Sequence, residues 1–247
     1  MLCGMSPEYT ESTYGDRSAP IYDQWHPEAP AEMVATLKDL AGTGPVLELG
    51  IGTGRIALKL AELGLEVHGI DASEAMIAKL RAKQGGDRIP VTLGDFGEVE
   101  VDGNFSLVFV VFNTFFCLAS QEDQVRCFAN VAKRLRSGGL FLIEAFVPDL
   151  TRFTRGQNVT TTKIAADEVR LDVSIHDSLA QRTVCQHVVI TEAGTRLYPV
   201  QVRYAWPSEL DLMARLAGMR LRERWSNWRH EPLTTESTNH VSVYEKP

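Results

Sequence analysis

The first 145 residues alternate short apolar runs with segments whose apolar residues recur at helical spacing. Runs of strand length occupy residues 46–49, 66–71, 91–93, 107–112 and 140–145. Helical spacing covers residues 31–40, 56–63, 74–83 and 120–135. Strands that alternate with helices form β-α-β units, so this pattern predicts a parallel sheet with helices on both faces.

Beyond about residue 149 the pattern changes to alternation of apolar and polar residues. The alternation is clearest over residues 169–176, and similar runs occupy about 183–191 and 197–205, with a turn at Ala193 and Gly194. A period of two predicts an antiparallel meander that has one packed face and one solvated face.

The C-terminal pattern is a helix over residues 208–218, followed by strand runs at about 220–225 and 241–244. We expect the two runs to join the main sheet as a hairpin, which gives that sheet seven strands. The predicted fold class is therefore α/β, with a doubly wound, mostly parallel seven-stranded sheet and an antiparallel β meander inserted after the fifth strand.

The chain is predicted to form a single domain covered by an N-terminal lid. Residues 1–30 are rich in aromatic rings that have no periodic element of their own, and we expect them to pack over the domain as this lid. The predicted divisions are the lid (1–30), the core (31–149), the inserted meander (150–206) and the C-terminal helix and hairpin (207–247).

Composition narrows the possible functions. The 247 residues carry a formal net charge of −7 and are 44% hydrophobic. An acidic chain lacks the basic surface that binds phosphates, so no nucleic-acid partner is expected. The apolar runs are too short to cross a membrane and the first residues do not resemble a signal peptide, which predicts a soluble, cytoplasmic protein. The four cysteines show no metal-ligand spacing, so no metal is predicted.

A glycine-rich loop follows the first predicted strand. Gly50, Gly52 and Gly54 stand between this strand and a helix, an arrangement that lets the backbone approach a ligand closely. Arg55 stands where a dinucleotide-binding loop needs its third glycine, and Glu48 directs an acid toward the loop. A carboxylate there repels a pyrophosphate and attracts an ammonium group.

Two further acids end the second and third predicted strands. Asp71 lies 21 residues beyond Gly50, where a carboxylate binds ribose hydroxyls in this architecture. Asp95 follows Gly94 and can accept a hydrogen bond from an adenine amino group. The loop and the acids together predict a nucleoside ligand that carries an amino group.

These motifs resemble those of the class I S-adenosylmethionine-dependent methyltransferases. The resemblance rests on E-L-G-I-G-T-G, G-I-D and G-D-F and covers about residues 14–145. The tail resembles the subgroup that methylates small metabolites, including amino-sugar N-methyltransferases. The resemblance implies a Rossmann-like fold, S-adenosylmethionine as the cofactor and S-adenosylhomocysteine as the product.

The resemblance also implies roles for individual residues. The glycines would pass under the methionine part of the cofactor, with Glu48 anchoring its amino group, while Asp71 would hold the ribose. The implied cofactor-binding set is Tyr14, Tyr22, Glu48, Gly50, Gly52, Gly54, Arg55, Asp71, Ala72, Met76, Asp95, Phe96 and Phe112.

The acceptor side is less specific. The candidate bases or acids are His26, His187 and Glu144. The candidate substrate-contacting residues are Trp25, Asn113, Phe116, Trp225 and His230. A sulfonium methyl group is already activated, so the protein needs mainly to position the acceptor and manage its proton.

The function predicted is methyl transfer to a nitrogen, carbon or oxygen of a small metabolite in secondary metabolism, such as an amino sugar, phenol or indole. The alternatives are a C-methyltransferase for ubiquinone or lipid and a non-catalytic S-adenosylmethionine-binding protein. A nicotinamide-dependent dehydrogenase is a third. The expected partner is a small-molecule acceptor, and the expected assembly is a monomer or homodimer.

Overall fold

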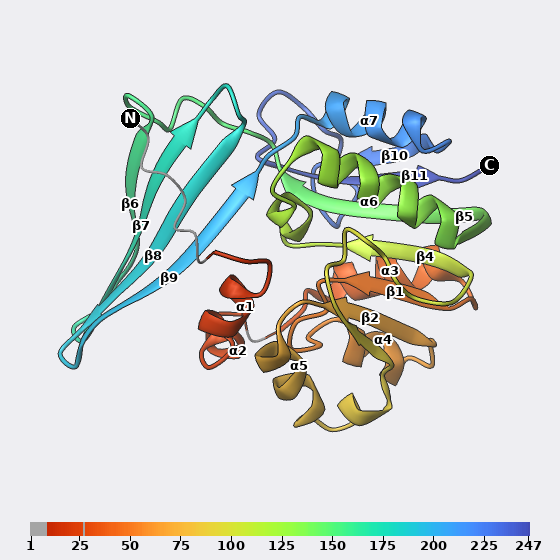
Figure 1. The fold of residues 1–247 in the computed structure, drawn as a ribbon, viewed down its shortest axis with the longest axis horizontal. Coiled ribbons are helices and arrows are strands. Elements are labelled where there is room, and N and C mark those ends of the chain that lie inside the picture. Colours follow the sequence, from red (N-terminus) through yellow and green to blue (C-terminus); the bar gives the residue numbers. More distant parts are fainter. Residues whose placement is uncertain (1–8, 27) are drawn as a thin grey trace.

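Two sheets of different kinds make up the molecule (Figure 1). The computed structural model describes residues 9–26 and 28–247. A seven-stranded sheet with helices on both faces lies beside a four-stranded antiparallel sheet, and two short N-terminal helices lie between them (Figure 1). These helices are α1 (Thr13–Ser18) and α2 (Tyr22–Trp25).

The seven-stranded sheet has the strand order β10-β11-β5-β4-β1-β2-β3. Its strands are β1 (Val46–Leu49), β2 (Val67–Asp71), β3 (Val91–Leu93), β4 (Phe105–Val110), β5 (Leu135–Phe146), β10 (Arg220–Trp225) and β11 (Asn239–Glu245). The first five are parallel, and β11 runs antiparallel between β5 and β10. This confirms the predicted fold class, including the C-terminal hairpin.

Helices cover both faces of this sheet because each helix has one apolar side. Phe128 of α6 and Met213 of α7 pack on one face, whereas Leu37 of α3 and Leu60 of α4 pack on the other. A capping box between Ser120 and Asp123 starts α6. The helices are α3 (Ala31–Ala41), α4 (Ala57–Glu62), α5 (Glu74–Arg81), α6 (Gln121–Arg134) and α7 (Pro207–Leu216), with 3₁₀ turns η1 (Gly86–Arg88) and η2 (Thr114–Cys117).

The four-stranded sheet is the predicted meander with one additional strand. Its strands, in order, are β6 (Gln157–Ile164), β7 (Glu168–Asp177), β8 (Arg182–Thr191) and β9 (Gly194–Arg203). Strand β6 is absent from the sequence-based prediction because it is a mostly polar edge strand, exposed along nearly its whole length, and has no clear alternation.

The register of this sheet decides which side chains meet. Asp172 of β7 pairs with His187 of β8, and His187 pairs with Tyr198 of β9. Paired residues project from the same face of a sheet, so these three lie in one row. This face of the sheet points toward the loops of the main sheet. No helix of the described residues is long and apolar enough to span a membrane.

Candidate active site

A cavity of about 1590 Å³ lies where the two sheets and the N-terminal helices meet. One wall consists of loops at the carboxyl ends of the parallel strands, and the other is the inner face of the four-stranded sheet. Ligands of open α/β sheets bind at the carboxyl ends of the strands. The volume exceeds the 300–1,000 Å³ or so of an ordinary small-molecule site, so there is room for two ligands.

The glycine loop borders this cavity. Gly50 and Gly52 have φ values of +70° and +56°, in the left-handed region that favours glycine. A Cβ atom on Gly52 would meet only the carbonyl oxygen of Gly50, at 4.0 Å, so the space above Gly52 is open. Gly54 has a different use, since its Cβ would lie 2.2 Å from the side chain of Leu80 on α5. It permits close helix packing and does not line the cavity.

Asp71 is fixed at the end of β2 by two backbone donors. Its Oδ2 accepts from the Gly52 N–H at 2.7 Å and its Oδ1 from the Ser73 N–H at 2.9 Å. Burial raises the pKa of Asp71. Each carboxylate oxygen keeps an unused lone pair, so Asp71 can still accept hydrogen bonds from a ligand.

The wall of the cavity continues from Asp71 to Asp95 and the residues near both. Asp95 accepts a hydrogen bond from the Gly97 N–H at 2.8 Å, and burial raises its pKa. Three further predicted cofactor residues line the same cavity: Ala72, Met76 and Phe96. The structure therefore brings the predicted ribose and adenine residues together.

Glu48 is a buried acid with one unsatisfied oxygen. It is 4% exposed, and its Oε2 has no hydrogen-bond partner among the described residues. Burial raises the pKa of Glu48 to about 8. It borders a small second cavity of about 20 Å³, which it shares with Tyr22 and Arg55. A buried polar atom without a partner is rare in native proteins, so this oxygen requires a hydrogen-bond partner from a ligand or a water molecule.

The N-terminal helices are bonded to the loops beneath them. Asp23 accepts hydrogen bonds from the Thr53 hydroxyl at 2.6 Å and from the Lys83 ammonium at 2.9 Å. Asp16 accepts one from the Ser73 hydroxyl at 2.6 Å. Tyr14 and Tyr22 also line the cavity, and burial raises the pKa of both phenols.

Trp25 links α2 to the four-stranded sheet. Its ring centroid lies 5.0 Å from that of Tyr198 and 6.0 Å from that of His187, and the Arg170 guanidinium lies 4.8 Å from the ring. The described N-terminal segment thus contacts both walls of the cavity, as a lid would.

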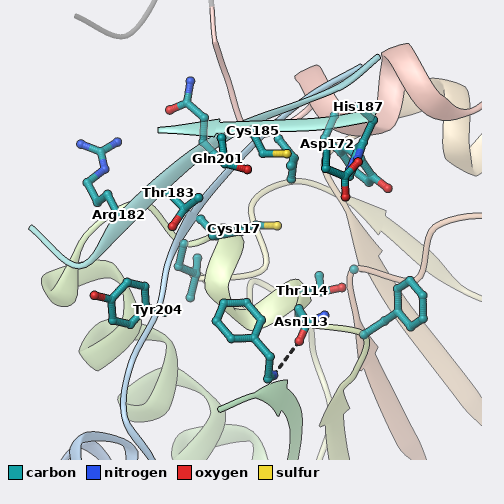
Figure 2. A pocket seen from close by; sticks show the side chains of 18 of the residues that line it. Asn113, Thr114, Cys117, Asp172, Arg182, Thr183, Cys185, His187, Gln201 and Tyr204 are labelled. Atoms are coloured by element: carbon teal, nitrogen blue, oxygen red, sulfur yellow. Dashed lines mark hydrogen bonds and ion pairs between the residues drawn. The ribbon is translucent and has the colours of Figure 1, made fainter. Parts of the chain in front are cut away.

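Two histidines face the cavity from different elements. His187 Nδ1 lies 2.6 Å from Asp172 Oδ1, and Figure 2 shows the pair together on the strands, across from the turn that carries Asn113 and Thr114. His26 follows α2 and packs edge-on against Phe112, with ring centroids 4.7 Å apart. Burial lowers the pKa of His26, and the neighbouring Arg55 lowers it further.

Several predicted acceptor residues lie elsewhere. Trp225 and His230 stack on each other at 3.8 Å, and His230 bonds the Thr36 hydroxyl of α3, away from the cavity. Phe116 is fully buried and packs against Phe146 at 4.9 Å. The structure therefore does not bring these three predicted substrate residues to the large cavity, because sequence cannot tell an aromatic residue that packs in the core from one that lines a cavity.

Glu144, predicted as a pocket acid, is held by hydrogen bonds outside the large cavity. It does not line the large cavity, and both of its carboxylate oxygens already accept hydrogen bonds, from the Trp228 indole N–H at 2.7 Å and the Phe112 backbone N–H at 3.0 Å. Arg55, predicted to bind the cofactor, does not line the large cavity. It donates a hydrogen bond to the Glu28 carbonyl at 2.9 Å and borders the small cavity together with Glu48.

Sequence reasoning missed Asp172 and the polar wall around it. The alternation over β7 predicts a polar face, but that face lines the cavity instead of facing bulk water. The signal was available in principle, because a hairpin closed by the pair Asp177 and Arg182 places Asp172 opposite His187. The residues of this wall that Figure 2 labels are Asp172, Arg182, Thr183, Cys185, His187, Gln201 and Tyr204.

Comparison with known proteins agrees with this geometry. Residues 46–139 match the family model of the methyltransferase domain. The structure of the CcbJ methyltransferase from Streptomyces caelestis superimposes with a TM-score of 0.90 and 39% identity, over 96% of this chain and 99% of that one. The chain belongs to the S-adenosylmethionine-dependent methyltransferases. The cypemycin N-terminal methyltransferase of a Streptomyces species is 27% identical, over 81% of this chain and 82% of its own length.

A more distant methyltransferase shows the same fold. CalS10, an amino pentose methyltransferase of Micromonospora echinaspora involved in calicheamicin biosynthesis, superimposes with a TM-score of 0.72 and 18% identity, covering 92% of this chain and 97% of that one.

The residues of this methyltransferase fit its cofactor. The unpartnered oxygen of Glu48 suits the ammonium group of the methionine part, and the space over Gly52 admits the chain that carries it. Asp71 and Asp95 offer free lone pairs for the ribose and the adenine. The sequence predicts no metal. Asp172, Cys185 and His187 nevertheless bring one donor atom each within 4.8 Å of one another, a grouping that can hold an ion.

Proposed function

We propose that this methyltransferase transfers a methyl group to an amine nitrogen of a small natural product. One observation carries the proposal: a single cavity joins the cofactor wall to the His187–Asp172 pair on the opposite sheet. The names of two relatives, an N-terminal methyltransferase and an amino pentose methyltransferase, support nitrogen as the acceptor atom.

The chemistry requires positioning and the removal of one proton. S-adenosylmethionine, when bound, would supply a methyl group attached to a positively charged sulfur. When the methyl group is transferred, the sulfur is left as a neutral thioether. The cavity must hold the acceptor nitrogen about 3–3.5 Å from that carbon, in line with the bond that breaks. The nitrogen gives its lone pair to the methyl carbon and becomes positively charged, so a proton must then leave it.

His187 is the group proposed to take that proton. In the tautomer with the proton on Nδ1, the ring donates to Asp172, and this leaves Nε2 as an acceptor toward the cavity. The carboxylate then stabilises the imidazolium that forms. A positioned base of this kind contributes about 10²–10⁴ in rate. His26 is the second candidate, because burial lowers its pKa and so favours the neutral form of the ring, which can accept a proton.

The lining of the cavity favours a polar acceptor of appreciable size. The four-stranded sheet contributes hydroxyl, amide and charged side chains to its wall, among them Thr183, Gln201 and Arg170. A quinone or lipid acceptor would require a more apolar tunnel, so we rank the lipid C-methyltransferase below the amine N-methyltransferase.

Incubation with methyl-labelled S-adenosylmethionine and a panel of amines, phenols, indoles and quinones tests the proposal. We expect label to transfer to amines, and mass spectrometry should place it on nitrogen. Transfer to phenols, indoles or quinones in preference to amines would contradict the nitrogen assignment. Tight cofactor binding without transfer to any acceptor of the panel would favour the non-catalytic alternative.

A further inference from the structure

Two consecutive residues at the end of β4 have an unusual backbone conformation. Phe112 and Asn113 have φ values of +60° and +65°, although neither is glycine. The left-handed region is unfavourable for a bulky residue such as phenylalanine. Such a conformation persists only where the surrounding structure enforces it, and it occurs most often at functional sites.

The end of β5 enforces this turn through Glu144 and its neighbours. The Phe112 N–H donates to Glu144 Oε2 at 3.0 Å, and the Asn113 N–H donates to the Glu144 carbonyl at 3.3 Å. The Asn113 side-chain oxygen accepts in turn from the Phe146 N–H at 2.7 Å. The second carboxylate oxygen of Glu144 accepts from the Trp228 indole N–H at 2.7 Å, which fixes the orientation of the carboxylate.

The turn holds the Phe112 ring at the boundary between the two cavities. The residue is 41% exposed and borders both the large cavity and the small one beside Glu48. The Arg55 guanidinium lies 5.0 Å from the centre of the ring, and the His26 ring packs on it edge-on. The exposed surface of the ring borders both cavities, so a ligand that occupies them can cover it.

We propose that Glu144 is a positioning residue, which holds Phe112 in its left-handed conformation so that the ring forms one wall for the methionine end of the cofactor. Glu144 acts through the Phe112 backbone and does not touch the ligand. The inference rests on the cofactor part of the proposed function and is independent of which acceptor the enzyme methylates.

Calorimetric titration with two probes tests the inference. S-adenosylhomocysteine spans the whole cofactor site, whereas 5′-methylthioadenosine lacks the amino-acid part. Glu144→Ala removes the acceptor for the Phe112 N–H, and we expect it to weaken S-adenosylhomocysteine binding about tenfold or more while the affinity for methylthioadenosine changes by less than about twofold.

A rescue experiment separates positioning from general damage. In Glu144→Gln a single side-chain oxygen faces two donors, the Phe112 N–H and the Trp228 N–H. We therefore expect the affinity for S-adenosylhomocysteine to fall about five- to tenfold. Trp228→Phe removes one donor, and the double variant frees the glutamine oxygen for Phe112. The double variant should therefore bind S-adenosylhomocysteine more tightly than Glu144→Gln alone.

Glu245→Gln is the matched control. Glu245 is also a strand residue whose carboxylate accepts a hydrogen bond, from the Arg220 guanidinium at 2.8 Å. It is the last residue of β11 and pairs with Leu140 of β5, not with Glu144. Full affinity in Glu144→Ala, an equal loss for both probes, or a double variant as weak as Glu144→Gln would each overturn the inference. If the wild-type protein binds neither probe, the cofactor assignment itself fails.

Discussion

The seven-stranded sheet presents its functional groups at strand ends, whereas the four-stranded sheet presents them along the middle of its strands. In the first sheet, interior residues such as Val108 and Phe109 are fully buried under helices, so only the loops reach a ligand. In the second, one face lines the cavity and is approached only by the short N-terminal helices, so alternate residues along each strand reach the cavity. The proposed cofactor residues are therefore found in short sequence motifs, whereas the proposed acceptor residues are brought together by strand register.

If the seven-stranded sheet binds the cofactor and the four-stranded sheet binds the acceptor, substitutions in the two sheets should affect different measurements. The largest effect is expected for His187→Gln, which cannot take a proton. We expect kcat to fall about 10²–10⁴-fold, while the affinity for S-adenosylmethionine changes by less than about twofold. Steady-state kinetics and calorimetry measure the two quantities. Val188→Thr, on the same strand but outside the cavity lining, is the control, and a normal kcat in His187→Gln would remove this histidine as the base.

The converse is expected for the glycine loop. Gly52→Val places a β-branched residue at φ +56° and fills the space kept for the cofactor, so we expect affinity for S-adenosylmethionine to fall about 100-fold or more. Gly42→Val is the control, because Gly42 has a similar φ of +61° with no atoms near its Cβ and lies far from the cavity. If both variants bind the cofactor normally, the loop is only a turn.

The sequence predicts the candidate site residues of the seven-stranded sheet better than those of the four-stranded sheet, because the former lie at strand ends and the latter lie along the strands. Strand ends such as those at Asp71 and Asp95 can be identified because a short apolar run stops close to an acid. Glu144 shows the same local pattern, yet it bonds Trp228 from a distant loop, and nothing local reveals that contact. The pairing of Asp172 with His187 depends on a hairpin register that alternation alone does not determine. The mostly polar edge strand β6 has no pattern to detect.

The main sheet also contains a histidine that should respond to pH without taking part in catalysis. His240 of β11 is fully buried, and its Nε2 has no hydrogen-bond partner among the described residues. Burial, with Arg224 nearby, lowers the pKa of His240 to about 4.

Because the folded pKa of His240 lies below the unfolded value of 6.5, its contribution to stability is complete above pH 6.5 and is lost as the pH falls toward 4. The loss should total about 3 kcal/mol, of which about 2 kcal/mol falls between pH 7 and pH 5. Urea unfolding of the wild type and His240→Gln at both pH values measures it. Parallel pH dependence in the two proteins would contradict the assignment.

Glu48 should make cofactor binding, rather than stability, depend on pH. Burial raises the pKa of Glu48 to about 8, so the side chain is mostly protonated at pH 7 and must lose its proton to pair with an ammonium group. We expect the affinity for S-adenosylmethionine to rise about fivefold from pH 7 to pH 8, with proton release detectable by calorimetry in buffers of different ionisation enthalpy. Glu48→Gln should bind more weakly and without this proton release, and equal release from both proteins would assign the proton to another group.

The smallest effect is expected where the N-terminal helices join the glycine loop. Burial tends to raise the pKa of Asp23, but hydrogen bonds from Thr53 and Lys83 outweigh it and lower the pKa overall. Asp23→Asn weakens both bonds, and because the pair is partly exposed, we expect a two- to fivefold loss of affinity for S-adenosylmethionine, less at high salt. Glu62→Gln removes the exposed ion pair with Lys59, whose charged atoms are 3.1 Å apart, and is the control for a change of surface charge.

Faster cofactor dissociation from Asp23→Asn in stopped-flow measurements, with the association rate nearly unchanged, would show that Asp23 holds the N-terminal helices closed. An unchanged dissociation rate would mean that these helices cover the cofactor without retaining it.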